Sequence, residues 1–509
     1  MLNSVLTNLD SFLWGAPFTL FVIGVGLYFL IRSGFFPLAH FHHMMHHTMG
    51  SLTSKETHNK KAGQTTPFEA ICIAVGGSVG CGCIGGIATA VAVGGPGAVF
   101  WMWVFGLVAM MVKMVEITLG CHYRSKNEKG EYFGGATYYM EKGIGREQKH
   151  KYGFALAWLF GIGFVAQFLG GSQAYTISEV LNTTFHFNMI VVTLIYSAFV
   201  FYIIYKGVPR IGAVAKKLVP FKCVAFLVGG VLLMILNYQN LPSVFYSIFH
   251  DAFNGSAALG GFGGATIMVA MRNGVARGLN SNEAGQGSSP QIQSTSNTVH
   301  PVRQGLWGCF EVFVDTFIVC SITALSILVT GVLGTGKTGA TLTIAAFQTD
   351  FGIIGPIFIA LMCVMFGITT TSGWFTYYVS IINHGLRYKP ILRDKVLKVF
   401  KFLYPIPNII IVSSIVLTGN GPDLFWTIVD LTLVIPVFGN LLGLICLRKK
   451  FWSLLKDYKA RYLGVGEVDP NFNLFYEDDP KVAAEEEAIR EEARRITSEA
   501  YAKSNKAAM

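Results

Sequence analysis

Long apolar stretches alternate with short polar loops along most of the chain. A segment of about 20 apolar residues is long enough to cross the hydrocarbon core of a bilayer as a helix. By this criterion the sequence predicts an all-α, polytopic membrane protein with about eleven transmembrane helices. The expected spans are residues 12–31, 66–92, 97–119, 154–181, 188–205, 218–236, 258–277, 306–333, 353–379, 397–417 and 424–447.

Glycines interrupt the second of these stretches at residues 76, 77, 80, 82, 85 and 86, within the sequence GGSVGCGCIGGIATAVAVGGPGAVFWMW from Gly76 to Trp103. A helix that breaks at membrane depth leaves backbone groups unpaired, and this is tolerated where they line a cavity or bind a ligand. The glycines therefore predict a broken helix at a transport site. Close packing of helices through small residues is the alternative interpretation.

A second interrupted segment, GGFGGAT from Gly260 to Thr266, begins the next set of five expected spans. Two broken helices at matching places in two halves indicate an inverted repeat whose break points meet near the bilayer midplane. The halves would be residues 66–236 and 258–447, with the helix at 12–31 outside the repeat. A flexible loop that enters the membrane is the alternative for the second segment.

Composition supports a membrane protein, because 52% of the 509 residues are hydrophobic and only 13% are charged, against about 25% charged in soluble domains. The net charge of +10 comes from short loops, among whose cytoplasmic charges we count Arg277, and not from a basic domain that could hold nucleic acid. These loops place the N-terminus outside and the C-terminus in the cytoplasm of a multi-pass cell-membrane protein. The nine cysteines show no CxxC pair.

Two segments lie outside this pattern. His40, His43 and His47 share one helix face; they indicate either a metal site or, as the favoured interpretation, an amphipathic helix at the membrane surface. The tail at 451–509 is rich in Glu, Ala, Arg and Lys toward its end, which predicts a charged, partly helical cytoplasmic extension with no pocket of its own.

Six motifs, in order along the chain, resemble the alanine or glycine:cation symporters, the sodium:alanine symporter family of the APC superfamily. The similarity covers residues from about 10 to about 450. It implies a symporter domain at 1–450 with a leucine-transporter-like core of two inverted five-helix repeats, preceded by one extra helix. The similar segments are GGPGAVFWMW (Gly94–Trp103) with the run to Glu116, GGATYYMEKGIG (Gly134–Gly145), GVARGLNSNEAGQGS (Gly274–Ser288), HPVRQG (His300–Gly305), VDTFIVCSITAL (Val314–Leu325) and TTTSGW (Thr369–Trp374).

The resemblance also implies a substrate pocket at the break points. Helix N-termini suit the carboxylate of an amino acid, and side-chain oxygens suit its ammonium group. The chain departs from the family at Cys83 and Tyr175, where the family has asparagine, so the expected contact of position 83 with the carboxylate is altered. The residues expected to bind substrate are Gly80, Gly82, Cys83, Gln173, Phe262, Thr370 and Trp374.

For the ion, sodium prefers hard oxygen ligands. The hydroxyls of Thr369 and Thr370, facing the carbonyls of Gly76 and Val79, would form such a cage in a leucine-transporter-like core. Proton coupling is the alternative, because intramembrane carboxylates are costly and usually functional. The candidate carboxylates are Glu116, Glu179, Glu311 and Asp315.

Taken together, the resemblance predicts sodium-coupled uptake of a small neutral amino acid, alanine or glycine, by alternating access. Its expected partners are the amino acid, sodium and lipid, with no enzymatic activity and no cofactor other than the transported ion. A transporter of the same fold for a larger neutral amino acid is an alternative. An ion channel is less favoured because no repeated filter motif is present, and a membrane enzyme is less favoured because no HExxH motif is present.

Overall fold

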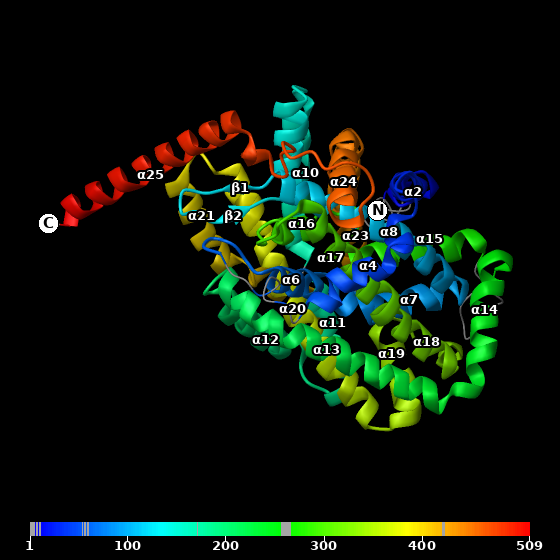
Figure 1. The fold of residues 1–509 in the computed structure, drawn as a ribbon. Helices are drawn as coiled ribbons and strands as arrows, with labels where there is room; N and C mark the ends of the chain where they lie inside the picture. The colour runs from blue at the N-terminus through cyan, green and yellow to red at the C-terminus, as the bar shows by residue number, and fades with distance from the viewer. Residues whose placement is uncertain are drawn as a thin grey trace.

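The computed structural model describes residues 12–52, 61–170, 172–255, 266–419 and 423–508, together with residues 6, 9, 54 and 58. The chain is almost entirely helical (Figure 1). Within the described residues, the only sheet pairs the short strands β1 (Ser125–Lys126) and β2 (Tyr132–Phe133) in an antiparallel hairpin. The predicted all-helical class is therefore confirmed.

Among the described residues, five helices or continuous helix pairs are long and apolar enough to cross a membrane, and the number is up to seven if two sharply bent pairs each count as one span. Three further apolar helices are shorter. The total of eleven spans and the inverted repeat remain predictions. The five spans are α8 (Gly97–His122), α13 (Val208–Leu236), α17 (Pro301–Val312) through α18 (Ser321–Val329), α20 (Ile354–Gly385), and α21 (Pro390–Leu403) with α22 (Ile406–Thr418).

The break predicted from the glycines is present. Helix α6 (Pro67–Ser78) stops, one turn of 3-10 helix follows as η2 (Cys81–Cys83), and α7 (Gly85–Gly94) continues at an angle of 52°. Thr66 begins α6 by accepting a hydrogen bond from the Glu69 N–H at 3.0 Å, a standard N-cap. At the bend the Cys81 N–H and the Val79 carbonyl oxygen bond to side chains of other helices and not to the helix backbone.

A second interruption lies within the described chain. Helix α15 (Ile267–Asn282) ends at Glu283, whose φ of 56° is left-handed, and the chain becomes helical again at α16 (Ser289–Gln293). Because left-handed backbone is costly for a residue other than glycine, this turn is held by its surroundings. The break expected at Gly260–Thr266 falls almost entirely outside the described residues and stays a prediction.

The remaining helices surround this core. Helix α2 packs on α8, α10 packs on α23, and α11 packs between α12 and α20. The bounds are α2 (Ala16–Arg32), α3 (Phe36–Ala39), α4 (Phe41–His47), η1 (Met49–Ser51), α9 (Ala136–Tyr139), η3 (Met140–Glu147), α10 (Tyr152–Ala166), η4 (Gln167–Gly170), α11 (Ser172–Phe185), α12 (Met189–Ile204), η5 (Tyr238–Asn240), α14 (Leu241–Asn254), η6 (Phe313–Cys320), η7 (Val332–Thr335), α19 (Gly339–Phe351), α23 (Asp423–Cys446), α24 (Arg448–Leu463), η8 (Tyr476–Asp478) and α25 (Pro480–Ala508).

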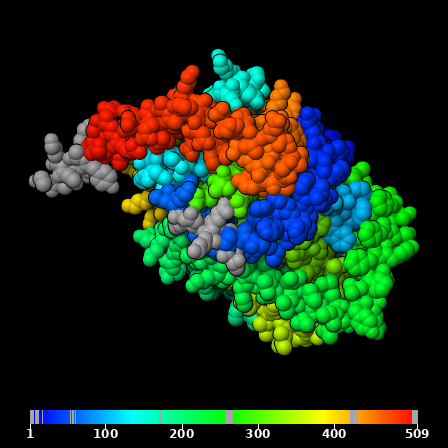
Figure 2. Space-filling model, in the orientation of Figure 1, coloured from blue at the N-terminus to red at the C-terminus, as the bar shows by residue number. Residues whose placement is uncertain are grey.

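The C-terminal tail lies along one edge of the molecule, and the far end of α25 projects away from the helical body (Figures 1 and 2). Its first half is docked. Lys142 pairs with Glu486 at 3.1 Å, and His122 Nδ1 lies 2.7 Å from the Leu474 carbonyl oxygen. The sequence predicted a charged helical extension, and the structure adds that the extension packs against the end of α8 and against η3.

Candidate functional site

A cavity of about 560 Å³ lies where the two interrupted helices meet the middle of α20. This volume falls in the range of ligand pockets, about 300–1,000 Å³. Its wall includes the broken turn at Gly80, Cys81 and Gly82, the hydroxyl side chain of Thr370, and the ring of Trp374. The cavity therefore brings together five of the seven expected substrate residues, namely Gly80, Gly82, Gln173, Thr370 and Trp374.

Gln173 and Thr370 hold the broken turn in place. The Cys81 N–H donates to Gln173 Oε1 at 2.9 Å, and the Thr370 hydroxyl donates to the Gly76 carbonyl oxygen at 2.9 Å. These bonds satisfy two of the backbone groups that the interruption frees. Gln173 on α11 is thus a positioning residue for the turn as well as part of the cavity wall. Phe262 lies outside the described residues.

Trp374 connects the cavity to the second interruption. Its indole N–H donates to Glu283 Oε1 at 2.8 Å, and its ring stacks on Phe164 with centroids 5.3 Å apart. Glu283 also lines the cavity. Sequence reasoning gave Glu283 no role, although it lies in the GVARGLNSNEAGQGS segment. The signal that could have found it is a carboxylate in a glycine-rich segment directly after an expected span.

Arg277 and Asp430 were also missed as cavity residues. Arg277 was interpreted as a cytoplasmic loop charge, but it lies inside α15 and lines the cavity, with its guanidinium 3.9 Å from Asp430 on α23. That interpretation is corrected, because α15 begins later and extends beyond residue 277. The cavity wall therefore carries charges of both signs, which suits a zwitterionic ligand.

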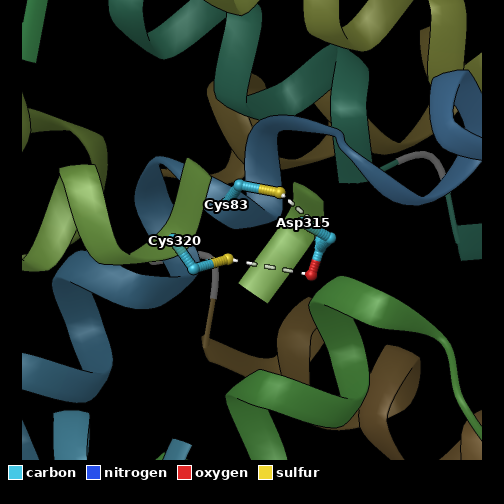
Figure 3. A group of neighbouring side chains, drawn as sticks. All are labelled: Cys83, Asp315 and Cys320. Carbon is cyan, nitrogen blue, oxygen red and sulfur yellow. Dashed lines mark hydrogen bonds between the residues drawn. The ribbon is translucent and has the colours of Figure 1, made fainter. Parts of the chain in front are cut away.

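Cys83 points away from the cavity, into a buried cluster with Asp315 and Cys320 (Figure 3). Its sulfur lies 3.2 Å from Asp315 Oδ1 and 3.0 Å from the Ser281 hydroxyl. Ser281 in turn donates to Asp315 Oδ1 at 2.9 Å. The cluster fastens the broken turn to α15 and η6, so the structure gives Cys83 a contact with other helices and not with the cavity.

The other carboxylates differ in their surroundings. Glu179 lines the cavity and accepts from the Tyr175 hydroxyl at 3.3 Å. Glu116 is fully buried and accepts from Asn440 at 2.5 Å. Glu311 is fully buried and pairs with Lys113 at 3.3 Å. Only Glu179 among the four candidate carboxylates therefore meets the cavity.

The cage expected for sodium contains a lysine side chain. Lys222 on α13 is fully buried, and its Nζ donates to the Val79 carbonyl oxygen at 2.7 Å and to Thr369 Oγ1 at 2.5 Å. The Thr369 hydroxyl itself donates to the Phe366 carbonyl oxygen at 2.9 Å. The predicted oxygens are thus close together, and a primary ammonium group occupies the position between two of them.

The histidine run does not form a metal cluster. Within the described residues, the only group of ligand atoms close enough for a metal is Cys83, Asp315 and Cys320. His43 Nε2 lies 2.9 Å from the Tyr458 hydroxyl, and burial lowers the pKa of His43 to about 4. The neutral ring therefore joins α4 to α24, and the amphipathic helix at the membrane surface remains a prediction.

The geometry defines a class of protein, a membrane transporter with its binding cavity at two interrupted helices. The match to known proteins gives the family: residues 1–472 match the model of the sodium:alanine symporter family, and the chain belongs to this family. It is therefore a multi-pass membrane protein of a transporter family.

Individual relatives agree with this assignment. The "Sodium/alanine symporter AgcS" of Methanococcus maripaludis is 30% identical over 87% of this chain and 94% of its own length. The "Probable sodium/glutamine symporter GlnT" of Bacillus subtilis is 32% identical over 94% of each chain. A solved sodium-coupled sialic acid symporter shares the fold with a TM-score of 0.50, at 14% identity over 82% of this chain and 83% of its own.

The broken turn offers a matched pair of glycine variants. A Cβ at Gly80 would lie 2.7 Å from Thr370 Oγ1 and 3.0 Å from Gln173 Oε1, whereas a Cβ at Gly82 meets nothing within 4 Å. Overpacking costs about 1–3 kcal/mol, so Gly80→Ala should weaken substrate affinity by about ten- to hundredfold. Gly82→Ala should change the affinity for the smallest substrate by about twofold. Saturable uptake in proteoliposomes measures both; equal effects would contradict the assignment of the turn.

Proposed function

We propose that the protein imports a small neutral amino acid, alanine or glycine, together with a cation, by alternating access. The observation that carries the proposal is the polar cavity at the broken turn, closed on one side by the Trp374 ring. A zwitterion needs donors for its carboxylate and acceptors for its ammonium group within one enclosed space. Both kinds of group line this cavity.

The carboxylate fits the broken turn at Gly80 and Gly82. Backbone N–H groups freed at the start of α7 favour an anion there, since the helix N-terminus carries partial positive charge. The ammonium group fits the acceptor side, where Gln173 and Glu283 present oxygens. Cys83 is left out of this assignment because its side chain points into the buried cluster with Asp315.

The position of the Trp374 ring indicates how large a substrate side chain the cavity can hold. The ring is fixed by its bond to Glu283 and its stacking on Phe164, so it limits the space for a side chain. Relatives within the family carry names for both alanine and glutamine. A larger neutral amino acid is therefore the second candidate substrate, and the rigid indole favours the smaller one.

The cation follows from the family and from the cage. Sodium is the ion in the names of the relatives and is the first candidate. The second candidate is the proton, favoured by the ammonium group of Lys222 between Val79 and Thr369. Uptake driven by an imposed sodium gradient, compared with uptake driven by an imposed proton gradient, distinguishes the two cations.

The substrate is tested by counterflow in proteoliposomes, in which unlabelled amino acid inside drives entry of the same labelled compound without an ion gradient. We expect alanine and glycine to exchange. Leucine, glutamine and glutamate should exchange about tenfold or more slowly, because a single group that does not fit the pocket lowers the rate by about that factor. Exchange of glutamine at the alanine rate would replace the assignment with the larger substrate. No exchange of any neutral amino acid would reject the proposed function.

A further inference from the structure

A buried cluster of two thiols, a carboxylate and a hydroxyl lies behind the broken turn; Figure 3 shows the thiols and the carboxylate. None of the four side chains is more than 1% exposed, and none lines the substrate cavity. The proposed function therefore leaves the cluster unused. Its members are Cys83 in η2, Ser281 near the end of α15, and Asp315 and Cys320 in η6.

The polar atoms of the cluster have the spacing of ligands around one metal ion. Cys83 Sγ lies 3.2 Å from Asp315 Oδ1, and Cys320 Sγ lies 3.9 Å from Asp315 Oδ2. The Ser281 hydroxyl oxygen lies 3.0 Å from each sulfur. Bonds of about 2.3 Å to sulfur and 2.0–2.2 Å to oxygen place neighbouring ligands of a tetrahedral ion about 3.3–3.8 Å apart. Small side-chain rotations would therefore bring the four atoms around one ion.

The two sulfur atoms determine which metals fit. Hard cations such as magnesium prefer oxygen ligands, whereas thiolates select zinc and other soft ions. Two thiolates and one carboxylate carry three negative charges, so a divalent ion leaves one negative charge in excess. Lys113 and Lys222 are fully buried and act electrostatically on Asp315 from outside the cluster. Their positive charges favour an anionic centre at this place.

The carboxylate is held in position by a further pair of hydrogen bonds. The Thr316 hydroxyl donates to Asp315 Oδ2 at 3.1 Å, and the Asn282 side-chain amide donates to Thr316 Oγ1 at 3.1 Å. Such outer bonds orient the ligands of protein metal sites and strengthen metal binding. The carboxylate therefore faces the two sulfurs without a metal to direct it.

We propose that this cluster is a binding site for a thiophilic divalent metal ion, of which zinc is the first candidate. Its ligands are Cys83, Asp315 and Cys320, and the Ser281 hydroxyl oxygen takes the fourth position. Two metal–sulfur bonds form, and the two thiol protons leave to solvent. The ion enters from the cavity, because Gly82, the residue before Cys83, is exposed and lines it.

A metal ion at this site would link three elements that the hydrogen bonds now connect only weakly. It would join the broken turn in η2 to α15 and to η6, and the same turn forms part of the cavity wall. Alternating access requires helices around the cavity to move against one another. Zinc should therefore inhibit transport. This consequence rests on the proposed function, whereas metal binding itself does not.

The experiment uses the full chain, purified without a histidine tag. Thermal unfolding with zinc, and separately with magnesium, reports metal binding without any transport. Cadmium is the second probe, because its bonds to thiolates absorb in the ultraviolet and so report the sulfur ligands directly. The variants are Cys83→Ser and Cys320→Ser. Cys309→Ser is the matched control, since Cys309 is a buried thiol on α17 that donates to the Met110 carbonyl oxygen.

We expect zinc, and not magnesium, to stabilise the wild type and Cys309→Ser, and cadmium to give the thiolate absorption in both. Loss of an outer bond to a metal ligand costs about 10- to 100-fold in affinity. Thr316→Val should weaken zinc binding by about this factor, and each of the two serine variants of the cluster by more than about 100-fold. Zinc should stop counterflow in the wild type and in Cys309→Ser, but not in Cys83→Ser.

Two results overturn the proposal. One is zinc binding that Cys83→Ser and Cys320→Ser leave unchanged, which would place the metal elsewhere, for example on the histidines of α4. The other is a wild type that gives no cadmium–thiolate absorption and no stabilisation by zinc; this test needs no variant to fold. If no amino acid exchanged in counterflow, the proposed function would fail, and the binding measurements would still decide the metal site.

Discussion

Glu311→Ala should be among the most destabilising single substitutions in this protein, costing about 3–5 kcal/mol, as removal of one partner of a buried ion pair does. Glu311 and Lys113 are fully buried and lie 3.3 Å apart. Glu311 also accepts from Ser289 at 2.6 Å and from Gln293 at 2.8 Å. Its loss leaves a buried ammonium group and two donors without their acceptor.

The same pair holds the second interruption. Lys113 Nζ donates to the Asn282 carbonyl oxygen at 2.8 Å, at the end of α15, while Glu311 binds both ends of α16. Loss of the carboxylate should therefore release the segment that contains Glu283, and substrate affinity should fall with stability. The effect on affinity is indirect, because neither Lys113 nor Glu311 lines the cavity.

Denaturant-induced unfolding in detergent micelles measures the cost. Lys113→Met combined with Glu311→Ala should recover part of the loss, because the unpaired charge is removed. Glu492→Ala is the matched control: it breaks a contact with Arg495 on α25 in which both side chains are more than half exposed, and it should cause no measurable change. If Glu311→Ala behaved like the control, the pair would not be buried as described.

The sequence predicted the local part of the site well. The glycines between Gly76 and Gly86 specify where the helix breaks, since no other residues leave room for a bent backbone among close-packed helices, and the break lies at Gly80. Thr370 and Trp374 lie four residues apart on one face of the same helix, so both side chains line the cavity. These features depend on a single segment and its periodicity.

Features that depend on the register between helices were missed. Lys222 follows two loop lysines at the start of an expected span, and a lysine there ordinarily extends to the membrane surface. That it points inward to Val79 follows only from how α13 packs on α6. Cys83 is the converse case: it is adjacent to the cavity in sequence, but the 3-10 turn directs its sulfur to Asp315.

Charge counting failed at Arg277 for a related reason. The expected span ended at residue 277, so the arginine was counted with the loop, whereas α15 continues to Asn282. Hydropathy cannot distinguish a charge at a helix end from one that faces a polar cavity. The carboxylate that pairs with this partly buried guanidinium, Asp430, is about 150 residues further along the chain.

Replacing Trp374 should change which amino acids are transported. In Trp374→Ala the ring that stacks on Phe164 is gone, and the cavity gains space beside the broken turn. We expect alanine transport to weaken and leucine transport to improve, so that their ratio shifts by about ten- to two-hundredfold, the range for an apolar contact of this kind. Competition of each amino acid against labelled alanine measures the shift.

Trp374→Phe separates the ring from its hydrogen bond. The variant keeps an aromatic wall but loses the indole N–H. In the wild type this group donates to Glu283 Oε1 at 2.8 Å, so the substitution removes a donor from the carboxylate. Since Glu283 keeps its bond to Ser288, its carboxylate should turn toward the cavity, and affinity for every amino acid should change while the size preference stays. If Trp374→Phe broadened the size range as much as Trp374→Ala, the indole N–H and not the ring would set the size limit. In that case Glu283→Gln in the presence of Trp374 should keep the preference for alanine, because its amide oxygen can still accept from the indole N–H.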